Sequence, residues 1–300
     1  MSGNETNEGY ALVTPAKNEE ANLLKVAEAV VNQTVTPRLW VIVDDGSTDR
    51  TQQIIRDLQG NQSWIVASSL PEHRRDINVH YAEVCKHGFD VAIRYLEEHD
   101  ISYEFLGLID ADTVVESRYF EKLIGEFRRD RGLGVASGGL FLQRNGIIEL
   151  ENGDGSSPRG SGRLWRKQCF FETGGYEPCE APPDTISNVR AKLLGFGARQ
   201  FPSIEALHLR PTASEEGFWA GYEKKGAAWH YLNAHPALVL LNAIFFAAQP
   251  PRYRGVAFFL GYFAAFVRRE KKIGDEEISR YFWERRPIEA ITEALGERRF

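Results

Sequence analysis

The first part of the chain alternates short apolar runs with segments in which apolar residues recur at helical spacing. Apolar residues fill Tyr10–Ala16, and from Leu23 to Val31 they return with the period of a helix. The next apolar run, Leu39–Val43, stops at a cluster of turn formers and helix caps in 44–49, ahead of another amphipathic segment. Two strand-helix units in succession predict a parallel sheet with helices on its faces.

The alternation continues further along the chain. Strands are expected over Ser63–Ala67 and Phe105–Ile109, and each is followed by an amphipathic helix. Strands are expected again within 132–150, and the Gly- and Ser-rich stretch 145–162 is expected to form a loop. The pattern ends near Leu209, which indicates a change of architecture.

We therefore divide the chain into an α/β domain, residues 1–210, and a helical C-terminal region, residues 211–300. The second region holds two apolar runs, Ala237–Ala248 and Gly255–Val267, followed by the basic stretch 268–272. Each run has 12 or 13 residues, short of the roughly 20 that cross a bilayer. Two interpretations remain open: the runs pack onto the main domain, or they lie in the membrane interface, where cations beside apolar surface bind anionic lipid.

Composition and charge narrow the class of protein. With 300 residues, 43% hydrophobic and 26% charged, the chain can bury a substantial core. The net charge of −6 argues against a nucleic-acid partner, so a phosphate-bearing ligand must be met by local charges. Three cysteines show no metal-ligand spacing, and the polar, acidic start of the chain does not resemble a secretory signal. We expect a cytoplasmic protein, peripheral on the cytoplasmic face of the membrane if the apolar runs dock there.

Polar clusters follow three of the expected strands, at 15–20, 44–47 and 110–112. In an open parallel sheet, ligands bind at the carboxyl ends of the strands, so these clusters are candidates for one site. Asp110 and Asp112 are two residues apart in an extended stretch, so both carboxylates can face one point, where a cation would relieve their repulsion. Oxygen ligands of this kind suit Mg²⁺ or Mn²⁺. The alternative is a turn or helix-cap pair ahead of the following helix.

Asp44 and Asp45 also allow two interpretations. They form a helix N-cap with an acidic first turn, or they hydrogen-bond to a base or ribose, as acidic residues after a sheet strand do in dinucleotide sites. The sequence contains no G-x-G-x-x-G and no P-loop. A nucleotide is therefore expected to be bound by carboxylates and a metal ion, which disfavours dehydrogenases and P-loop NTPases.

Six short motifs occur in one order between about residues 10 and 210: Pro15-Ala16-Lys17-Asn18-Glu19-Glu20, Val43-Asp44-Asp45-Gly46-Ser47-Thr48-Asp49, Lys86-His87-Gly88, Asp110-Ala111-Asp112, Gly174-Gly175-Tyr176 and Asp184. In this order they resemble the family 2 glycosyltransferases with the GT-A fold. The resemblance implies a Rossmann-like, mostly parallel α/β sheet flanked by helices, with a helical C-terminal extension. It also implies metal-dependent, inverting transfer of a hexose from a UDP- or GDP-sugar to a glycan or lipid-linked acceptor, in polysaccharide or lipid-linked saccharide assembly.

The resemblance assigns the nucleoside to the first two motifs. Pro15, Lys17 and Glu19 would lie against the base and ribose, and Asp45, with Asp44 beside it, would bind the same nucleoside. The family commonly has Tyr where this chain has Lys17. A cation would therefore replace stacking on the base, and the identity of the base stays open.

The later motifs are assigned to the diphosphate and the metal ion. Lys86 lies where the family often has a basic residue near the donor. Asp112 would be the principal metal contact, and Asp110 would hold the ribose or a metal-bound water. His208 lies where some GT-A enzymes have a further metal or diphosphate ligand, and a structural histidine is the alternative.

Asp184 is the candidate catalytic base. It would take the proton from the acceptor hydroxyl while a metal ion stabilises the charge on the leaving nucleoside diphosphate. The family's usual Glu-Asp is here Pro183-Asp184. The alternative role of Asp184 is to cap an expected helix over Ile186–Leu194.

The segment after the Gly- and Ser-rich stretch supplies further candidates. Gly162, Arg163 and Trp165 are candidates for a wall facing the donor sugar or acceptor, and Arg166 is a candidate phosphate contact. An ordinary loop and strand edge explain these residues equally well.

Two other functions compete with sugar transfer. A sugar-phosphate nucleotidyltransferase binds nucleotides on a related sheet, but it should have a Gly-rich, basic loop after the first strand, and Lys17 is the only such feature here. A catalytically silent module that binds a nucleotide or carbohydrate is kept open by Pro183, which replaces an acidic residue.

Overall fold

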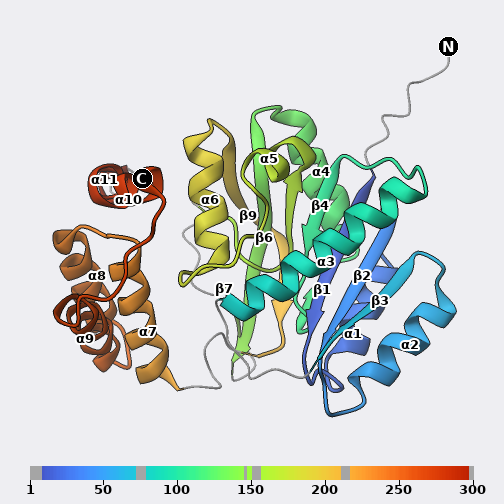
Figure 1. The fold of residues 1–300 in the computed structure, drawn as a ribbon, viewed down its shortest axis with the longest axis horizontal. Helices are drawn as coiled ribbons and strands as arrows, with labels where there is room; N and C mark the ends of the chain where they lie inside the picture. The colour runs from blue at the N-terminus through green and yellow to red at the C-terminus, as the bar shows by residue number, and fades with distance from the viewer. Residues whose placement is uncertain (1–8, 72–78, 145–146, 151–156, 211–216, 297–300) are drawn as a thin grey trace. The chain divides into compact units, whose positions relative to one another are not determined.

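The computed structural model describes residues 9–71, 79–144, 147–150, 157–210 and 217–296. The chain divides into two compact units. One unit comprises Met1–Cys179 and Pro183–Arg210, and the other comprises Glu180–Pro182 and Pro211–Phe300. The first unit carries the β-sheet and the second is helical (Figure 1).

One mixed sheet of nine strands, counted within the described residues, forms the centre of the first unit (Figure 1). The strands are β1 (Tyr10–Ala16), β2 (Leu39–Asp45), β3 (Ile65–Leu70), β4 (Phe105–Leu108), β5 (Thr113–Val115), β6 (Leu133–Arg144), β7 (Ile147–Leu150), β8 (Arg163–Arg166) and β9 (Gly197–His208). Their order is β3-β2-β1-β4-β8-β6-β9-β5, and β7 pairs with β6. Because β3, β2, β1 and β4 are parallel, the carboxyl ends of β1, β2 and β4 meet at one edge.

Helices cover both faces of this sheet. One face packs against α1 (Leu23–Val31), α2 (Thr51–Asn61) and α4 (Tyr119–Arg129), and the other against α3 (Val79–Glu98), α5 (Lys167–Glu172) and α6 (Pro183–Leu193). Every residue of β2 is buried, as expected for a central parallel strand covered on both sides. The first unit is therefore a three-layer α/β structure, as the alternation of apolar runs predicts.

Gly88 holds α3 close to the centre of the sheet. A Cβ atom at this position would lie 2.4 Å from Cγ1 of Val13 and 3.0 Å from Cγ2 of Val43. A larger residue would therefore push the helix off the sheet. The close approach fixes the first turn of α3, which contains His80 and Tyr81, over the ends of β2 and β4.

Three observed boundaries differ from the predicted ones near the site. β2 continues through Asp44 and Asp45, so both are strand residues and neither caps a helix. α6 begins at Pro183, which places Asp184 inside its first turn. β7 lies within the stretch predicted as a loop, and much of the rest of that stretch lies outside the described residues.

The second unit contains α7 (Phe218–Tyr231), α8 (Pro236–Ala248), α9 (Tyr253–Val267), α10 (Glu276–Arg280), a π-helical turn η1 (Tyr281–Arg285) and α11 (Arg286–Gly296). Glycines bring α7, α8 and α9 into backbone contact. A Cβ atom at Gly226 would lie 2.0 Å from the carbonyl oxygen of Phe258, and one at Gly255 would lie 2.1 Å from that of Ala243. Across the described ranges, no helix has the length and apolar character needed to span a bilayer.

Candidate active site

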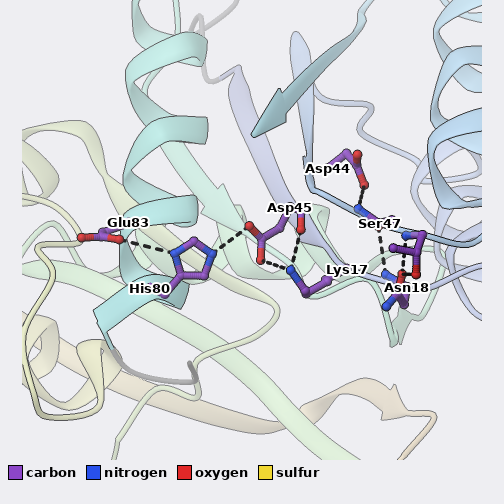
Figure 2. Close-up of polar contacts among 8 residues, drawn as sticks. Lys17, Asn18, Asp44, Asp45, Ser47, His80 and Glu83 are labelled. Carbon is purple, nitrogen blue, oxygen red and sulfur yellow. Dashed lines mark hydrogen bonds and ion pairs between the residues drawn. The ribbon is translucent and has the colours of Figure 1, made fainter. Parts of the chain in front are cut away.

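The carboxylate of Asp45 lies between a lysine and a histidine at the end of β2 (Figure 2). Lys17 Nζ is 2.7 Å from the backbone oxygen of Asp45 and 3.3 Å from its Oδ2. His80 Nε2, on α3, is 2.8 Å from Oδ1, and its Nδ1 is 3.4 Å from Glu83. The three side chains are largely but not fully buried, so they can meet the polar edge of a ligand.

Asp44 and Asn18 hold the loops that follow β1 and β2. Oδ1 of Asp44 accepts a hydrogen bond from the Ser47 N–H at 3.2 Å, and Oδ2 accepts one from Gln52 Nε2 at 3.1 Å. The Asn18 N–H donates to Ser47 Oγ at 2.9 Å, and Asn18 Oδ1 accepts from the Thr48 N–H at 2.8 Å (Figure 2). The two loops are thus tied together. Asp44 serves this local framework.

Glu19 is buried and is joined to Asp112 by Arg210. The Arg210 guanidinium contacts the Glu19 carboxylate and also lies 2.7 Å from Asp112 Oδ2. Asn22 donates to Glu19 Oε2 at 3.0 Å. Burial raises the pKa of Glu19, although Asn22 and Arg210 act in the opposite direction. Glu19 therefore anchors the arginine beside Asp112.

Asp110 and Asp112 form an electrostatically coupled pair after β4. Tyr81 donates to Asp110 Oδ1 at 2.6 Å, and Asp112 Oδ2 lies 3.4 Å from His208 Nε2. Burial and the charge of Asp112 raise the pKa of Asp110 to about 6. Burial also acts to raise the pKa of Asp112, but His208 and Arg210 outweigh it and the net effect is a lower pKa. His208 and Arg210 therefore outweigh burial at Asp112, whereas at Asp110 burial and the charge of Asp112 prevail although His208 opposes them.

Strand pairing explains why His208 meets Asp112. β5 runs antiparallel to β9 and places Thr113 opposite His208. Just beyond this pair, the Leu209 N–H donates to the backbone oxygen of Asp112 at 2.9 Å. Arg210 follows directly and reaches the Asp112 carboxylate.

The donor chemistry of this region fits a hard divalent cation. Asp110, Asp112 and His208 supply carboxylate oxygens and an imidazole nitrogen, and a cation would offset both the burial and the charge of Asp112 that raise the pKa of Asp110. Among the residues that the structure describes, no three such side chains already converge on one point. Substrate oxygens and water would therefore complete the coordination, as is usual for Mg²⁺.

Asp184 lies half-buried in the first turn of α6. A Cβ atom at Gly160 would lie 3.7 Å from Asp184 Oδ2, so the carboxylate faces the segment before β8. Tyr176 interacts electrostatically with Asp184 and with Asp110. Burial raises the pKa of Tyr176, and the charges of these two carboxylates raise it further. The Tyr176 ring packs edge-on against Tyr81, with 6.4 Å between centroids. Asp184 and Asp110 therefore both act electrostatically on Tyr176, which packs against Tyr81.

The predicted sugar wall lies inside the protein. Trp165 is fully buried and donates through Nε1 to Ser187 Oγ at 2.8 Å. Arg163 is also fully buried, with its guanidinium 4.6 Å from the Trp165 ring centroid and a hydrogen bond to Asn188. Gly162 has a φ of +67°, and a Cβ atom there would meet the Tyr119 hydroxyl at 2.5 Å. Arg163 and Trp165 thus contact α6, Gly162 packs against Tyr119 of α4, and none of the three forms an open wall.

Arg166 lies at the far end of the sheet from the carboxylate pair. It is opposite Phe105, where β4 begins, whereas Asp110 follows the end of β4. Its Nη2 donates to the Phe127 carbonyl at 2.9 Å, and its guanidinium lies 5.4 Å from the Phe127 ring centroid. The structure therefore does not place Arg166 where a phosphate contact was expected, because its buried side chain links β8 to α4.

Pro15 and Lys86 have less specific surroundings. Pro15 lies in β1 opposite Val43, half-buried near the loops that follow β1 and β2. Lys86 forms an exposed ion pair with Asp90 at 2.7 Å on the surface of α3. The structure gives Lys86 no contact with the site carboxylates, and its role near the donor stays a prediction.

Sequence reasoning missed three residues of the site: His80, Tyr81 and Arg210. His80 contacts Asp45 while the adjacent Tyr81 contacts Asp110, so one turn of α3 ties the two carboxylate clusters together. The sequence gives no signal for this turn, because it precedes the clear helical periodicity of α3. Arg210 could have been found, since in an extended segment it faces the same side as His208.

Replacing Asp110 by Asn should stabilise the metal-free protein at high pH. The pKa of Asp110 is about 6 in the folded state, against an ordinary value of 3.8 for an aspartate. The stability that this carboxyl contributes is therefore present below pH 4 and is lost as the pH rises through about 6. We expect Asp110→Asn to raise the free energy of unfolding by about 1–2 kcal/mol at pH 8 and by much less at pH 4.5.

Urea unfolding in the presence of EDTA at both pH values measures this difference. Asp112→Asn is the matched control with the opposite sign. The pKa of Asp112 is lowered, so its charge stabilises the fold at pH 8 and its removal should destabilise it. Two variants that both destabilise at pH 8 would contradict the assigned charge distribution.

Comparisons with known proteins agree with this architecture. Residues 11–146 match the family described as Glycosyl transferase family 2. A relative, "Poly-beta-1,6-N-acetyl-D-glucosamine synthase" of Staphylococcus epidermidis, is 24% identical over 141 residues, which is 47% of this chain. The matched region spans 31% of that relative's length.

Solved structures at low sequence identity share the fold. The mannosyltransferase PcManGT from Pyrobaculum calidifontis, in complex with GDP-Man and Mn²⁺, is 14% identical with a TM-score of 0.54, covering 95% of this chain and 84% of that one. S. aureus TarS 1-349, in complex with UDP-GlcNAc, is 13% identical with a TM-score of 0.52, covering 88% and 73%. The α/β unit with its carboxylates at the ends of β1, β2 and β4 thus has the GT-A glycosyltransferase fold. Residues 11–146 match glycosyltransferase family 2, which confirms the predicted resemblance over this part of the chain, and the predicted GT-A fold is confirmed.

Proposed function

We propose that this chain transfers a sugar from a nucleoside diphosphate sugar to an acceptor hydroxyl, with inversion at the anomeric carbon. The observation that carries the proposal is the meeting of Asp110, Asp112, His208 and Arg210 after β4. A diphosphate leaving group needs positive charge at its oxygens. These side chains combine two carboxylates and an imidazole, which are groups that bind metal ions, with a guanidinium, which binds phosphate well.

The nucleoside is proposed to lie over the loops that follow β1 and β2. Asp45 offers a carboxylate to a base or ribose, and Lys17 and His80 offer nitrogen groups on either side of it (Figure 2). Pro15 and Glu19 belong to the same stretch of chain. PcManGT binds GDP-Man and TarS binds UDP-GlcNAc, so a UDP- or GDP-sugar is the proposed donor.

Asp110, Asp112 and His208 are proposed to hold Mn²⁺ or Mg²⁺ together with the donor diphosphate. When bound, the ion would stabilise the charge that builds on the leaving diphosphate oxygen. Arg210 lies beside Asp112 and is positioned to contact the same diphosphate. Glu19 limits the movement of Arg210, because the guanidinium is anchored to both carboxylates.

Asp184 is proposed to be the base. It would accept the proton of the acceptor hydroxyl as the hydroxyl oxygen bonds to the anomeric carbon and the bond from this carbon to the diphosphate oxygen breaks. A half-buried carboxylate in the first turn of a helix remains accessible to a substrate hydroxyl. One displacement inverts the anomeric configuration.

The acceptor is proposed to be a glycan or a lipid-linked saccharide. The relative from Staphylococcus epidermidis is named as a polysaccharide synthase, and this supports a hydroxyl of a saccharide as the group that is modified. A cytoplasmic site of action fits the use of a nucleotide sugar as donor.

A screen of nucleotide sugars with Mn²⁺ tests the proposed function. We expect one UDP- or GDP-sugar to raise the melting temperature by a few degrees, since a ligand at about 100 times its Kd stabilises by about 2.7 kcal/mol. EDTA should remove most of this shift. The same donor should then release its nucleoside diphosphate when a saccharide acceptor is added.

Three outcomes would contradict the proposal. Tight binding of a nucleotide sugar without hydrolysis or transfer, over a panel of saccharide acceptors, would identify a silent binding module. Formation of a nucleotide sugar from a nucleoside triphosphate and a sugar phosphate would identify a nucleotidyltransferase. No stabilisation by any nucleotide sugar would exclude both the transferase and the silent nucleotide-binding module.

A further inference from the structure

Helices α8 and α9 of the second unit leave large apolar side chains exposed. Eight of them are each more than half exposed: Leu240, Leu241, Ile244 and Phe245 on α8, and Val256, Phe263, Phe266 and Val267 on α9. We call these eight residues the apolar face. Large apolar side chains that gather on the surface of a folded protein mark an interaction site.

The side chains of the apolar face are those that the packing between the helices leaves exposed. On α8, Val239 and Ala243 are buried, and on α9, Phe258 and Ala265 are buried. At 100° per residue, Val239 and Ala243 lie roughly opposite Leu241 and Ile244, and Phe258 and Ala265 lie roughly opposite Val256, Phe263 and Val267. Contact between α8 and α9 at Gly255 is already close at the backbone level. The core of this unit is therefore complete without the apolar face.

Cations border the apolar face at both ends of α9. Arg252 precedes the helix, and Arg268, Arg269, Lys271 and Lys272 follow it within five residues. All five are exposed. Glu270 is the single acidic residue in 268–272, and the stretch 236–267 contains no Asp or Glu. An apolar centre with a cationic rim is complementary to an anionic lipid surface.

We propose that the apolar face docks on an anionic membrane surface. The apolar side chains would enter the boundary between headgroups and acyl chains, and the rim cations would lie among the lipid phosphates. A second copy of the chain would fit the apolar face less well than a membrane does. Because both ends of α9 carry cations and no carboxylate lies between them, a face-to-face dimer would place cation against cation in either orientation.

Co-sedimentation of the full chain with vesicles tests this proposal, and it requires no transfer activity. We expect the chain to sediment with phosphatidylcholine vesicles that contain phosphatidylglycerol, and several-fold less with phosphatidylcholine alone. High salt should weaken the binding, because it screens the contribution of the rim. The result does not depend on the proposed sugar transfer.

Paired substitutions separate the apolar and cationic contributions. Leu241→Ser with Ile244→Ser should weaken binding to anionic vesicles at least about tenfold, since two exposed apolar anchors are lost. Leu24→Ser with Leu194→Ser removes two leucines of similar exposure in the first unit and should leave binding unchanged. Arg268→Ser with Lys271→Ser should reduce the preference for anionic vesicles. Circular dichroism checks that each variant is folded.

Three results would overturn the proposal. The first is a wild-type chain that fails to sediment with anionic vesicles. The second is equal vesicle binding by the Leu241→Ser/Ile244→Ser variant and the wild type. The third is a dimer, seen by light scattering, that becomes monomeric in this variant, which would assign the apolar face to a second copy.

Discussion

Asp184→Asn should lower kcat for sugar transfer by about 10²–10⁴-fold, the range that general-base catalysis contributes. Asn has nearly the same shape as Asp but does not accept a proton at neutral pH. Its side-chain oxygen can still accept the hydrogen bond from the Thr185 N–H that Asp184 Oδ1 accepts at 2.8 Å. The start of α6 should therefore keep its structure.

Donor binding should be almost unaffected by this substitution. The proposed nucleoside contacts lie on the loops after β1 and β2, whereas Asp184 lies on α6. Initial rates with saturating donor and acceptor give kcat, and calorimetric titration gives the donor Kd. A large loss of kcat with an unchanged Kd is the expected pattern for a residue that acts on the acceptor.

Glu177→Gln is the matched control for Asp184→Asn. Glu177 is a half-exposed carboxylate close to Tyr176 in sequence, and it pairs with Arg190 at 2.7 Å. This control removes a nearby negative charge without touching the proposed base, so kcat should change by less than about threefold, as expected for a surface ion pair. If Asp184→Asn retained the kcat of the control, another group would have to accept the proton.

Asp112→Ala should abolish metal-dependent transfer, with a loss of about 10³-fold or more. Removing a metal contact forfeits several kcal/mol of charge stabilisation, and each 1.36 kcal/mol is tenfold in rate. Asp112 is also the group that holds the guanidinium of Arg210, at 2.7 Å. Its removal would affect both positive charges that are proposed to meet the diphosphate.

Titration of Mn²⁺ into the variant with saturating donor measures the loss. We expect no stimulation of transfer and no Mn²⁺-dependent rise in melting temperature with the donor. Asp90→Ala is the control, because Asp90 is an exposed aspartate whose partner is Lys86 at 2.7 Å. This variant should respond to Mn²⁺ like the wild type.

Mn²⁺-stimulated transfer by Asp112→Ala would place the cation elsewhere. Transfer by the wild type that is indifferent to EDTA would point to Arg210 as the main positive charge at the diphosphate. In that case Arg210→Ala should cause the larger loss. The two variants therefore distinguish a metal-assisted mechanism from one that relies on the guanidinium.

The sequence by itself determined the strand-helix alternation and the polar clusters at strand ends. β1 has the bounds predicted from the apolar run Tyr10–Ala16, and β2 differs from its prediction by two residues at its end. Such runs are decisive because a central parallel strand is buried on both faces and must be apolar throughout. Parallel strands end at a common edge, so Asp45, Asp110 and Asp112 could be assigned to one site before their neighbours were known.

Only the tertiary structure decided which side chains meet these carboxylates. Arg210 reaches Asp112 across 98 residues of sequence, and it does so because β5 pairs with β9. His80 reaches Asp45 across 35 residues because Gly88 brings α3 close to the sheet. Pairings of this length leave no periodic trace in the sequence, since they depend on strand register and helix approach.

The sequence also did not show which of the predicted site residues are buried and which are exposed. Arg163, Trp165 and Arg166 read as surface candidates from their types, but β8 lies inside the sheet between β4 and β6, and all three side chains are buried. The surroundings of Asp110 and Asp112 were likewise decided by packing. The two residues look equivalent in the sequence, yet their pKa values shift in opposite directions. The residue types set the chemistry that is available at the strand ends, and packing decided that His208 and Arg210 lie at Asp112 while Asp110 is buried beside it.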